Sequence, residues 1–209
     1  MNKQPSQLAG VYAVTQPRPD LQEAVAAVLR GGVGIVQYRD KSEDADRRRE
    51  EAGALCRLCE EYGALFLVND DVDLAAAVAA HGVHLGRDDG AVVAARQQLG
   101  DTAWIGVSCY DDLDRARRLV AEGADYVAFG SIFPSPTKPE SGLAPMELLR
   151  SGREATGCPT VAIGGIDAGN IHEVAAAGAD AAAVVSALFA AEDPEAAARQ
   201  LVAQWQRSR

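Results

Sequence analysis

The chain has 209 residues and a formal net charge of −10 at pH 7, with 20 Lys and Arg residues against 30 Asp and Glu residues. An acidic protein of this kind repels nucleic acid and anionic membrane surfaces, so we exclude both as the main partner. The N-terminal segment has no cationic start followed by an apolar run, and no apolar run approaches the ~20 residues of a membrane span. We therefore expect a globular cytoplasmic protein in which residues 1–209 form a single domain. Its oligomeric state stays open, with a homo-oligomer as one alternative.

Short apolar segments alternate with longer helical patterns along the whole chain. This alternation predicts an α/β protein with a parallel sheet. The expected strands are Val11–Thr15, Gly34–Arg39, Leu65–Asn69, Val83–Gly86, Trp104–Ser108, Tyr126–Gly130, Thr160–Gly165 and Ala181–Ser186. The expected helices are Leu21–Arg30, Glu43–Tyr62, Leu74–Ala80, Ala91–Leu99, Leu113–Glu122, Pro145–Thr156, Ile171–Ala177 and Pro194–Gln206. Periodicity alone also allows an open doubly wound sheet, but eight regular units favour a closed (β/α)₈ TIM barrel.

In such a barrel the functional residues lie at the carboxyl ends of the strands and in the loops that follow. Gln37, Arg39 and Lys41 share one side of the segment that ends the second expected strand. Two cations on one side suit an anionic group, and a Gln and an Arg are costly to bury without a partner or a ligand. We therefore favour a binding role over a solvated strand end.

Carboxylates follow the third and fourth expected strands. Mg²⁺ is commonly held by one or two carboxylates together with phosphate oxygens and water, so Asp70 and Asp89 are the chosen ligands. Asp is also the preferred residue at a helix N-cap, and Asp71, Asp73 and Asp88 are candidates for that structural role.

The remaining strand ends offer donors for phosphate groups. Ser108 ends the fifth strand, and a longer loop after the sixth, residues 133–142, contains Ser135, Thr137 and Lys138. The seventh strand ends in a Gly-Gly pair that includes Gly165, and Ser186 ends the eighth. Barrels often bind phosphate after these two strands, where glycine lets backbone N–H groups approach closely.

Two other motifs are interpreted as structural. Cys56 and Cys59 have the spacing of a zinc or redox pair, but they lie in an expected helix and no second ligand pair accompanies them. The histidines at positions 81, 84 and 172 occupy a turn, a strand and a helix start, so they do not converge as a metal triad.

Two anionic sites and one metal suggest a diphosphate substrate that meets a monophosphate substrate, with catalysis by positioning and charge neutralisation. The residues at these positions resemble the thiamine phosphate synthase family over nearly the whole chain. The matching segments are QYRDK at 37–41, ND at 69–70, HLGRDD at 84–89, IGVS at 105–108, FPSPTK at 133–138, IGGI at 163–166 and VVS at 184–186. Their order and spacing together make the resemblance specific.

The resemblance implies a transferase that joins hydroxymethylpyrimidine diphosphate to thiazole phosphate, or to its carboxylated form, and releases diphosphate. In that family the carbon–oxygen bond breaks first, and the thiazole nitrogen captures the resulting pyrimidine cation. The implied pyrimidine diphosphate contacts are Gln37, Tyr38, Arg39, Asp40, Lys41, Asn69, Ser108 and Lys138, of which Arg39, Lys41, Ser108 and Lys138 are the expected catalytic residues. The implied thiazole phosphate contacts are Ser135, Pro136, Thr137, Gly165, Val185 and Ser186, and the implied Mg²⁺ ligands are Asp70 and Asp89.

One residue departs from the family pattern, because Arg87 stands where the family usually has Gln. Two rival functions remain open at this point. One is the related thiazole tautomerase branch, which does not need the complete metal and diphosphate set. The other is a regulatory barrel that binds phosphorylated thiamine intermediates without turnover.

Overall fold

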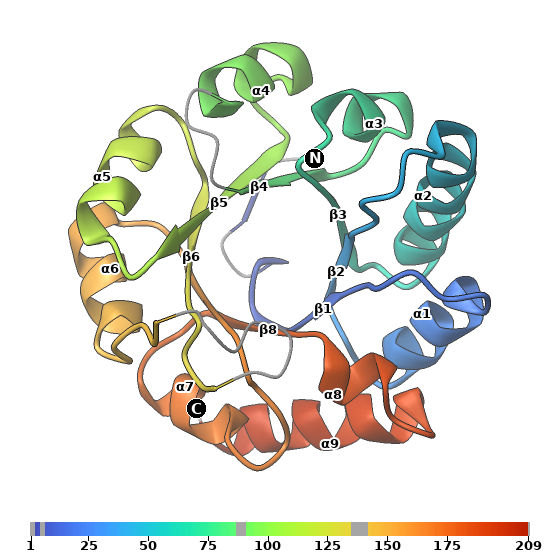
Figure 1. Ribbon diagram of the computed structural model, residues 1–209. Helices are drawn as coiled ribbons and strands as arrows, with labels where there is room; N and C mark the ends of the chain where they lie inside the picture. The colour runs from blue at the N-terminus through green and yellow to red at the C-terminus, as the bar shows by residue number, and fades with distance from the viewer. Residues whose placement is uncertain (1–2, 5–6, 87–90, 135–141, 209) are drawn as a thin grey trace.

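A computed structural model describes residues 3–4, 7–86, 91–134 and 142–208. Eight parallel strands form a closed barrel in chain order, and β8 pairs with β1 to complete it (Figure 1). The strands are β1 Gly10–Val14, β2 Ile35–Tyr38, β3 Leu65–Asn69, β4 Gly82–Leu85, β5 Trp104–Tyr110, β6 Tyr126–Phe129, β7 Thr160–Ile163 and β8 Ala181–Val184. The expected α/β class and TIM-barrel architecture are confirmed.

The helices form an outer ring around the strands, as Figure 1 shows. They are α1 Leu21–Arg30, α2 Ala45–Glu61, α3 Val72–Ala77, α4 Ala91–Leu99, α5 Leu113–Ala121, α6 Leu148–Thr156, α7 Ile171–Ala176, α8 Ser186–Phe189 and α9 Pro194–Arg207. The short helix α8 differs from the sequence prediction, which continued the last strand through Ser186. An apolar run such as the one that joins β8 to α8 suits either structure, so its periodicity does not fix where the strand ends.

The core has two apolar layers. The larger lies between the strands and the helices, and the smaller fills the barrel interior. Tyr12 and Tyr126 belong to the interior layer and are almost fully buried. Gly106 on β5 leaves room for the Tyr126 ring, since a Cβ at this position would lie 1.9 Å from Tyr126 Cζ. Leu8, which precedes β1, is also buried in the interior layer.

Aspartates in the αβ turns have structural roles, as expected for that end of the barrel. Asp125 accepts a hydrogen bond from the Ile105 backbone N–H and pairs with Arg96. Asp180 accepts one from the Thr160 N–H and pairs with Arg153 in the same way. The two aspartates end identical Gly-Ala-Asp segments, residues 123–125 and 178–180, so this repeat in the sequence reflects a shared turn structure and not a shared site.

The CxxC pair on α2 is also structural. Cys56 and Cys59 are both buried. Burial raises the thiol pKa to about 11 for Cys56 and about 12 for Cys59. A thiol that stays protonated at neutral pH is a poor metal ligand and a poor nucleophile, which agrees with the interpretation from sequence.

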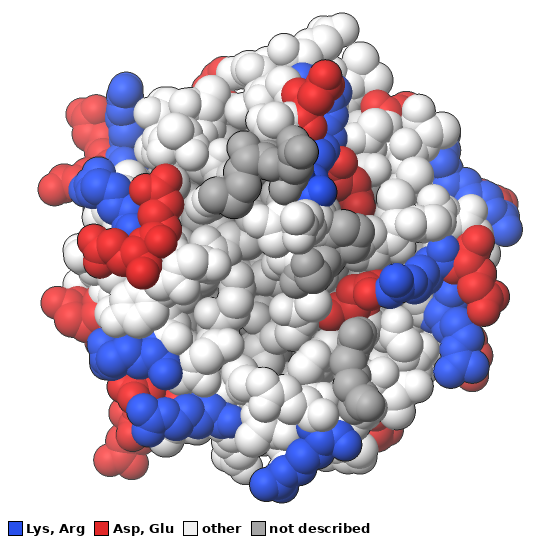
Figure 2. All heavy atoms as spheres, turned by 180° about the vertical axis from the view of Figure 1, so that it is seen from behind, with Lys and Arg blue, Asp and Glu red and all other residues white. Residues whose placement is uncertain are grey.

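Charges of both signs are mixed on the surface. On the face shown in Figure 2, acidic and basic side chains stand side by side near the rim, and uncharged residues, drawn white, predominate among the described residues toward the centre. Among the described residues, no helix is both long enough and apolar enough to cross a membrane.

Candidate active site

A cavity of about 750 Å³ lies at the carboxyl ends of the strands, and every strand of the barrel or the loop after it contributes to its wall. This is the end at which barrel enzymes place their chemistry. Seven residues selected from the sequence line this cavity: Gln37, Arg39, Asn69, Ser108, Gly165, Val185 and Ser186. The barrel therefore brings together positions that are up to 149 residues apart, from 37 to 186.

Strand alternation separates the residues that follow β2. Gln37 and Arg39 line the cavity, whereas Tyr38 points outward and its hydroxyl donates to Glu51 on α2 at 2.7 Å. Asp40 is likewise turned away from the cavity, since its carboxylate accepts from the Ser42 N–H and from Arg47. Lys41 is exposed and is not part of the cavity wall. The structure thus places only two of these five expected contacts in the wall.

Arg39 is the cation of the described cavity wall. It is half-buried and, among the residues that the structure describes, has no carboxylate partner. Its backbone N–H donates to the buried hydroxyl of Thr15 at 2.9 Å, which fixes the chain where the side chain enters the cavity. An unpaired guanidinium in a concave site is suited to bind a phosphate group.

The Asp70 carboxylate is held in a defined orientation. Its Oδ1 accepts from the Gly86 N–H at 2.8 Å, and its Oδ2 accepts from Asn69 Nδ2 at 2.8 Å. The residue has a φ of 60°, a left-handed conformation that non-glycine residues rarely adopt. Each carboxylate oxygen keeps a second lone pair, so Asp70 can still bind a hard cation such as Mg²⁺.

The neighbouring aspartates have other roles. Asp71 caps α3, because its carboxylate accepts from the Leu74 N–H at 2.8 Å. Asp73 accepts from Gln98. The helix-cap alternative is thus confirmed for Asp71, which leaves Asp70 as the carboxylate that follows β3 at the barrel mouth. In the described part of the chain, no group of three or more His, Cys, Asp or Glu residues forms a ready-made metal site.

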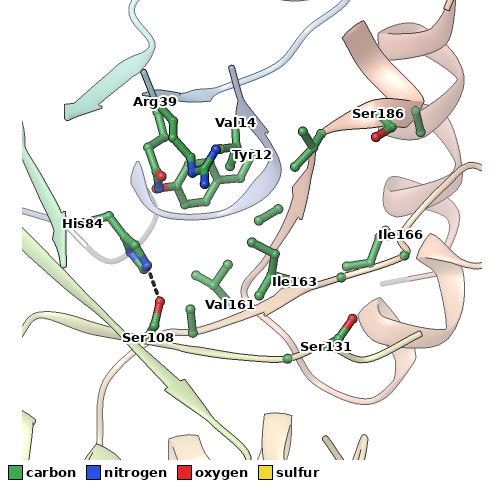
Figure 3. Close-up of a pocket in the computed structure, with 18 of the residues that line it drawn as sticks. Tyr12, Val14, Arg39, His84, Ser108, Ser131, Val161, Ile163, Ile166 and Ser186 are labelled. Atoms are coloured by element: carbon green, nitrogen blue, oxygen red, sulfur yellow. Dashed lines mark hydrogen bonds between the residues drawn. The ribbon is translucent and has the colours of Figure 1, made fainter. Parts of the chain in front are cut away.

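A chain of buried hydrogen bonds crosses the barrel beneath the cavity. Gln37 Nε2 donates to Tyr12 Oη at 2.6 Å, and Tyr12 Oη lies 3.1 Å from Tyr126 Oη. The Tyr126 hydroxyl lies 2.9 Å from His84 Nδ1, and His84 Nε2 lies 3.0 Å from Ser108 Oγ. Figure 3 shows the His84 and Ser108 side chains pointing toward each other.

Sequence reasoning missed this network. Treating His84 as a structural residue overlooked its place in the cavity wall beside Ser108. Burial lowers the pKa of His84 to about 4, so the imidazole is neutral at physiological pH. A signal was available, because Tyr12, His84 and Tyr126 are polar or aromatic residues inside expected strands of an otherwise apolar barrel.

Arg115 on α5 is a second residue that the sequence did not single out. It is buried, and its guanidinium donates to the Ser108 carbonyl at 2.9 Å and to the Gly86 carbonyl at 3.1 Å. It also lies over the ring of Tyr110, 6.0 Å from its centroid. Arg115 therefore ties the ends of β4 and β5 together. Gly86, which follows β4, supports Asp70, and β5 bears Ser108.

The opposite side of the cavity is rich in backbone and small residues. Gly164 and Gly165 have φ values of 103° and 64°, and a Cβ on Gly165 would lie 2.5 Å from the Pro134 carbonyl oxygen. Ser186 is the first residue of α8. In Figure 3 the apolar Val161 and Ile163 separate this side from His84 and Ser108.

Five of the expected site residues lie outside the described part of the chain. They are Asp89, Ser135, Pro136, Thr137 and Lys138, and Arg87 and Asp88 lie outside it as well.

Comparison with known proteins identifies the family. The family model described as thiamine monophosphate synthase matches residues 11–188. The chain is 52% identical over 210 residues to the thiamine-phosphate synthase of Thioalkalivibrio sulfidiphilus, covering 99% of this chain and 100% of that protein. It is 54% identical over 200 residues to that of Chromobacterium violaceum, covering 94% and 96% of the two chains.

Solved structures agree. Thiamine phosphate pyrophosphorylase from Pyrococcus furiosus superposes with a TM-score of 0.88 at 35% identity, covering 97% of this chain and 98% of the other. A 3-hexulose-6-phosphate synthase, at 21% identity and a TM-score of 0.68, shares the barrel fold. With a family model that spans most of the barrel and relatives that match almost from end to end, the chain belongs to the thiamine monophosphate synthase family.

Proposed function

We propose that this chain forms thiamine phosphate at the barrel mouth by joining 4-amino-2-methyl-5-hydroxymethylpyrimidine diphosphate to 4-methyl-5-(2-hydroxyethyl)thiazole phosphate or its carboxylated form. Family membership supports this reaction over a thiazole tautomerase or a binding barrel without turnover. One observation supports the placement of the site. On one side of the cavity lies Arg39, which has no carboxylate partner among the described residues. On the other lies the glycine-rich β7 end with Ser186, and the apolar Val161 and Ile163 lie between the two sides.

The pyrimidine diphosphate binds on the side of β2 to β5. Arg39 donates to the diphosphate, while Gln37, Asn69 and Ser108 offer polar atoms to the pyrimidine and its diphosphate. Lys41, at the exposed rim, and Lys138 add positive charge around the diphosphate. Because the protein is acidic overall, these local cations are what make the site attractive to a polyanion.

Mg²⁺ fits this side of the cavity. Asp70 is held by two N–H donors with lone pairs to spare, and it would share the ion with Asp89. When bound, Mg²⁺ neutralises negative charge on the departing diphosphate. The protein side chains contribute by positioning the two substrates, because this substitution needs no protein nucleophile activated by a general base.

The thiazole phosphate binds on the opposite side. Gly165 brings the backbone close to the phosphate, and next to it Val185 is the N-cap and Ser186 the first residue of the short helix α8. Ser135, Pro136 and Thr137 complete this subsite in the proposal. The apolar side chains of Val161 and Ile163 limit ordered water near the reacting carbon, so the thiazole nitrogen captures the pyrimidine cation before water does.

The test is an assay of purified protein with both phosphorylated substrates, with Mg²⁺ and with EDTA. We expect thiamine phosphate and diphosphate in equal amounts, and loss of both products when the metal is removed. Binding of both ligands without diphosphate release would instead support the regulatory barrel. Isomerisation of the thiazole without any use of the pyrimidine diphosphate would support the tautomerase.

A further inference from the structure

We propose that the buried chain of hydrogen bonds from Gln37 to Ser108 runs in one direction, so that Ser108 presents its hydroxyl proton to the pyrimidine substrate. Tyr126 and His84 are then positioning residues, because they act on the substrate through Ser108. The inference rests on the proposed function for the identity of the ligand, while the direction of the chain stands on the geometry alone.

The network lies at the inner end of the cavity, and most of its members are buried. Tyr12 and Tyr126 are 1% and 0% exposed, Gln37 is 4% exposed and His84 is 8% exposed. Their surroundings are apolar side chains of the barrel interior, including Leu67. A buried hydroxyl that has no acceptor for its proton destabilises the folded protein, so each hydroxyl in the chain is expected to donate.

The donor at one end fixes the direction. Gln37 Nε2 donates to Tyr12 Oη, so the Tyr12 oxygen accepts and its own proton must go elsewhere. The only other described partner of that oxygen is Tyr126 Oη, which lies at 3.1 Å. Tyr12 therefore donates to Tyr126, and the Tyr126 proton then goes to its other partner, His84 Nδ1 at 2.9 Å.

The tautomer of His84 follows from this order. With Nδ1 accepting, the ring proton resides on Nε2 and is donated to Ser108 Oγ at 3.0 Å. The reverse order would have Tyr126 donate to Tyr12, and the Tyr12 proton would then lack an acceptor among the described residues. The Ser108 oxygen thus accepts from His84, and its proton is left for a ligand in the cavity.

Both ends of the chain then have a defined polarity toward the cavity. Ser108 is a donor, which suits a pyrimidine ring nitrogen with its lone pair. Gln37 directs its amide nitrogen to Tyr12 and keeps Oε1 as an acceptor, which suits an exocyclic amino group. An aminopyrimidine offers this combination. A pyrimidine with a carbonyl in place of the amino group would instead place the carbonyl oxygen, an acceptor, against the acceptor Gln37 Oε1.

The direct test is the tautomer of His84, measured by ¹⁵N NMR of the free protein at neutral pH. His81 is an internal reference, because its Nδ1 accepts from the Phe66 N–H and its proton must also be on Nε2. A His84→Asn variant assigns the signals. We expect an Nε2-protonated His84, and an Nδ1-protonated ring would overturn the proposal.

A kinetic test separates positioning from general stability. Tyr126→Phe removes the donor to His84 Nδ1, so the imidazole can adopt the tautomer that is protonated on Nδ1. Ser108 can then donate its proton to His84 Nε2 instead of to the substrate. We expect KM for the pyrimidine diphosphate to rise about tenfold, the loss of one hydrogen bond, with KM for the thiazole phosphate unchanged. The same variant should also change the tautomer signals of His84.

The matched control is Thr160→Val. It also removes a buried hydroxyl, which donates to the Leu149 carbonyl at 2.8 Å, but it does so at the other end of β7 and away from the cavity. Equal KM values for Tyr126→Phe, Thr160→Val and the wild type would overturn the positioning role. If the tautomer is as expected but the wild type forms no thiamine phosphate, the proposed function fails and the direction of the chain stands.

Discussion

Replacement of Gly106 by alanine should destabilise the barrel interior strongly, because the glycine makes room for the Tyr126 ring. An added Cβ would lie 1.9 Å from Tyr126 Cζ and 2.3 Å from its hydroxyl oxygen. Carbon atoms in contact are normally about 3.5–4.0 Å apart, so the ring must move by roughly 2 Å. A shift of this size breaks its hydrogen bonds to Tyr12 and His84, which now measure 3.1 and 2.9 Å.

The magnitude follows from two contributions. Overpacking a core costs about 1–3 kcal/mol, and two lost buried hydrogen bonds cost about 1 kcal/mol each, for a total of about 3–5 kcal/mol. Domains are typically stable by about 5–15 kcal/mol, so the variant should still fold at low temperature. Urea unfolding, followed by circular dichroism, measures the difference in free energy of unfolding.

A matched glycine substitution provides the control. Gly53 lies inside α2, and a Cβ there would meet its nearest neighbour, Arg57 Nη1, at an ordinary 3.6 Å. Gly53→Ala should therefore stabilise the protein by about 0.5–1 kcal/mol through helix propensity. If Gly106→Ala lowers the free energy of unfolding by less than about 1 kcal/mol while Gly53→Ala behaves as expected, the tight packing of Tyr126 is refuted.

Three further predictions concern the wall of the cavity and the cysteines. Arg115→Met should lower the free energy of unfolding by about 2–4 kcal/mol, since two carbonyls lose their donor, and should raise KM for the pyrimidine diphosphate in steady-state kinetics. If Arg115→Met leaves that KM unchanged, the side chain does not position the site. Gly165→Ala should raise KM for the thiazole phosphate more than KM for the pyrimidine diphosphate. The control is Gly157→Ala, which should leave both KM values unchanged. It adds a Cβ at a similar φ of 71°, with nothing within 4 Å. Cys56 and Cys59 should resist alkylation by iodoacetamide in the native protein at pH 8 and react after unfolding, as mass spectrometry would show, because burial raises the pKa of both thiols. Rapid alkylation of the folded protein would contradict their burial.

The fold could be predicted from the sequence because local patterns agree with the global topology. Eight apolar strands with helices between them leave few alternatives to a barrel, and the strand-end rule then selects Arg39, Asn69 and Ser108 without knowledge of any contact. Tyr38 shows the limit of a motif that is taken as a continuous range. In a strand, neighbouring side chains point to opposite faces, so a residue between two cavity residues faces the helices.

The residues that the sequence did not reveal act through tertiary contacts. The partners of His84 come from β5 and β6, 24 and 42 residues away along the chain, and no local pattern predicts such pairings. Arg115 looks like any other cation on a charged amphipathic helix, and only the packing of α5 against the barrel shows that its guanidinium reaches two strand ends. Burial and hydrogen-bond partners, which a sequence does not contain, distinguish these residues from the surface charges around them.

The most direct measurement compares wild type and Arg39→Gln in one assay that counts both products in the presence of saturating Mg²⁺. The wild type should release thiamine phosphate and diphosphate in a ratio of one to one. Arg39→Gln should lose about 10–100-fold in kcat/KM, the effect of one or two charge-assisted hydrogen bonds, while its thermal unfolding stays at the wild-type temperature. Wild-type kcat/KM in this variant, or a wild-type protein that forms no thiamine phosphate, would contradict synthesis at this cavity.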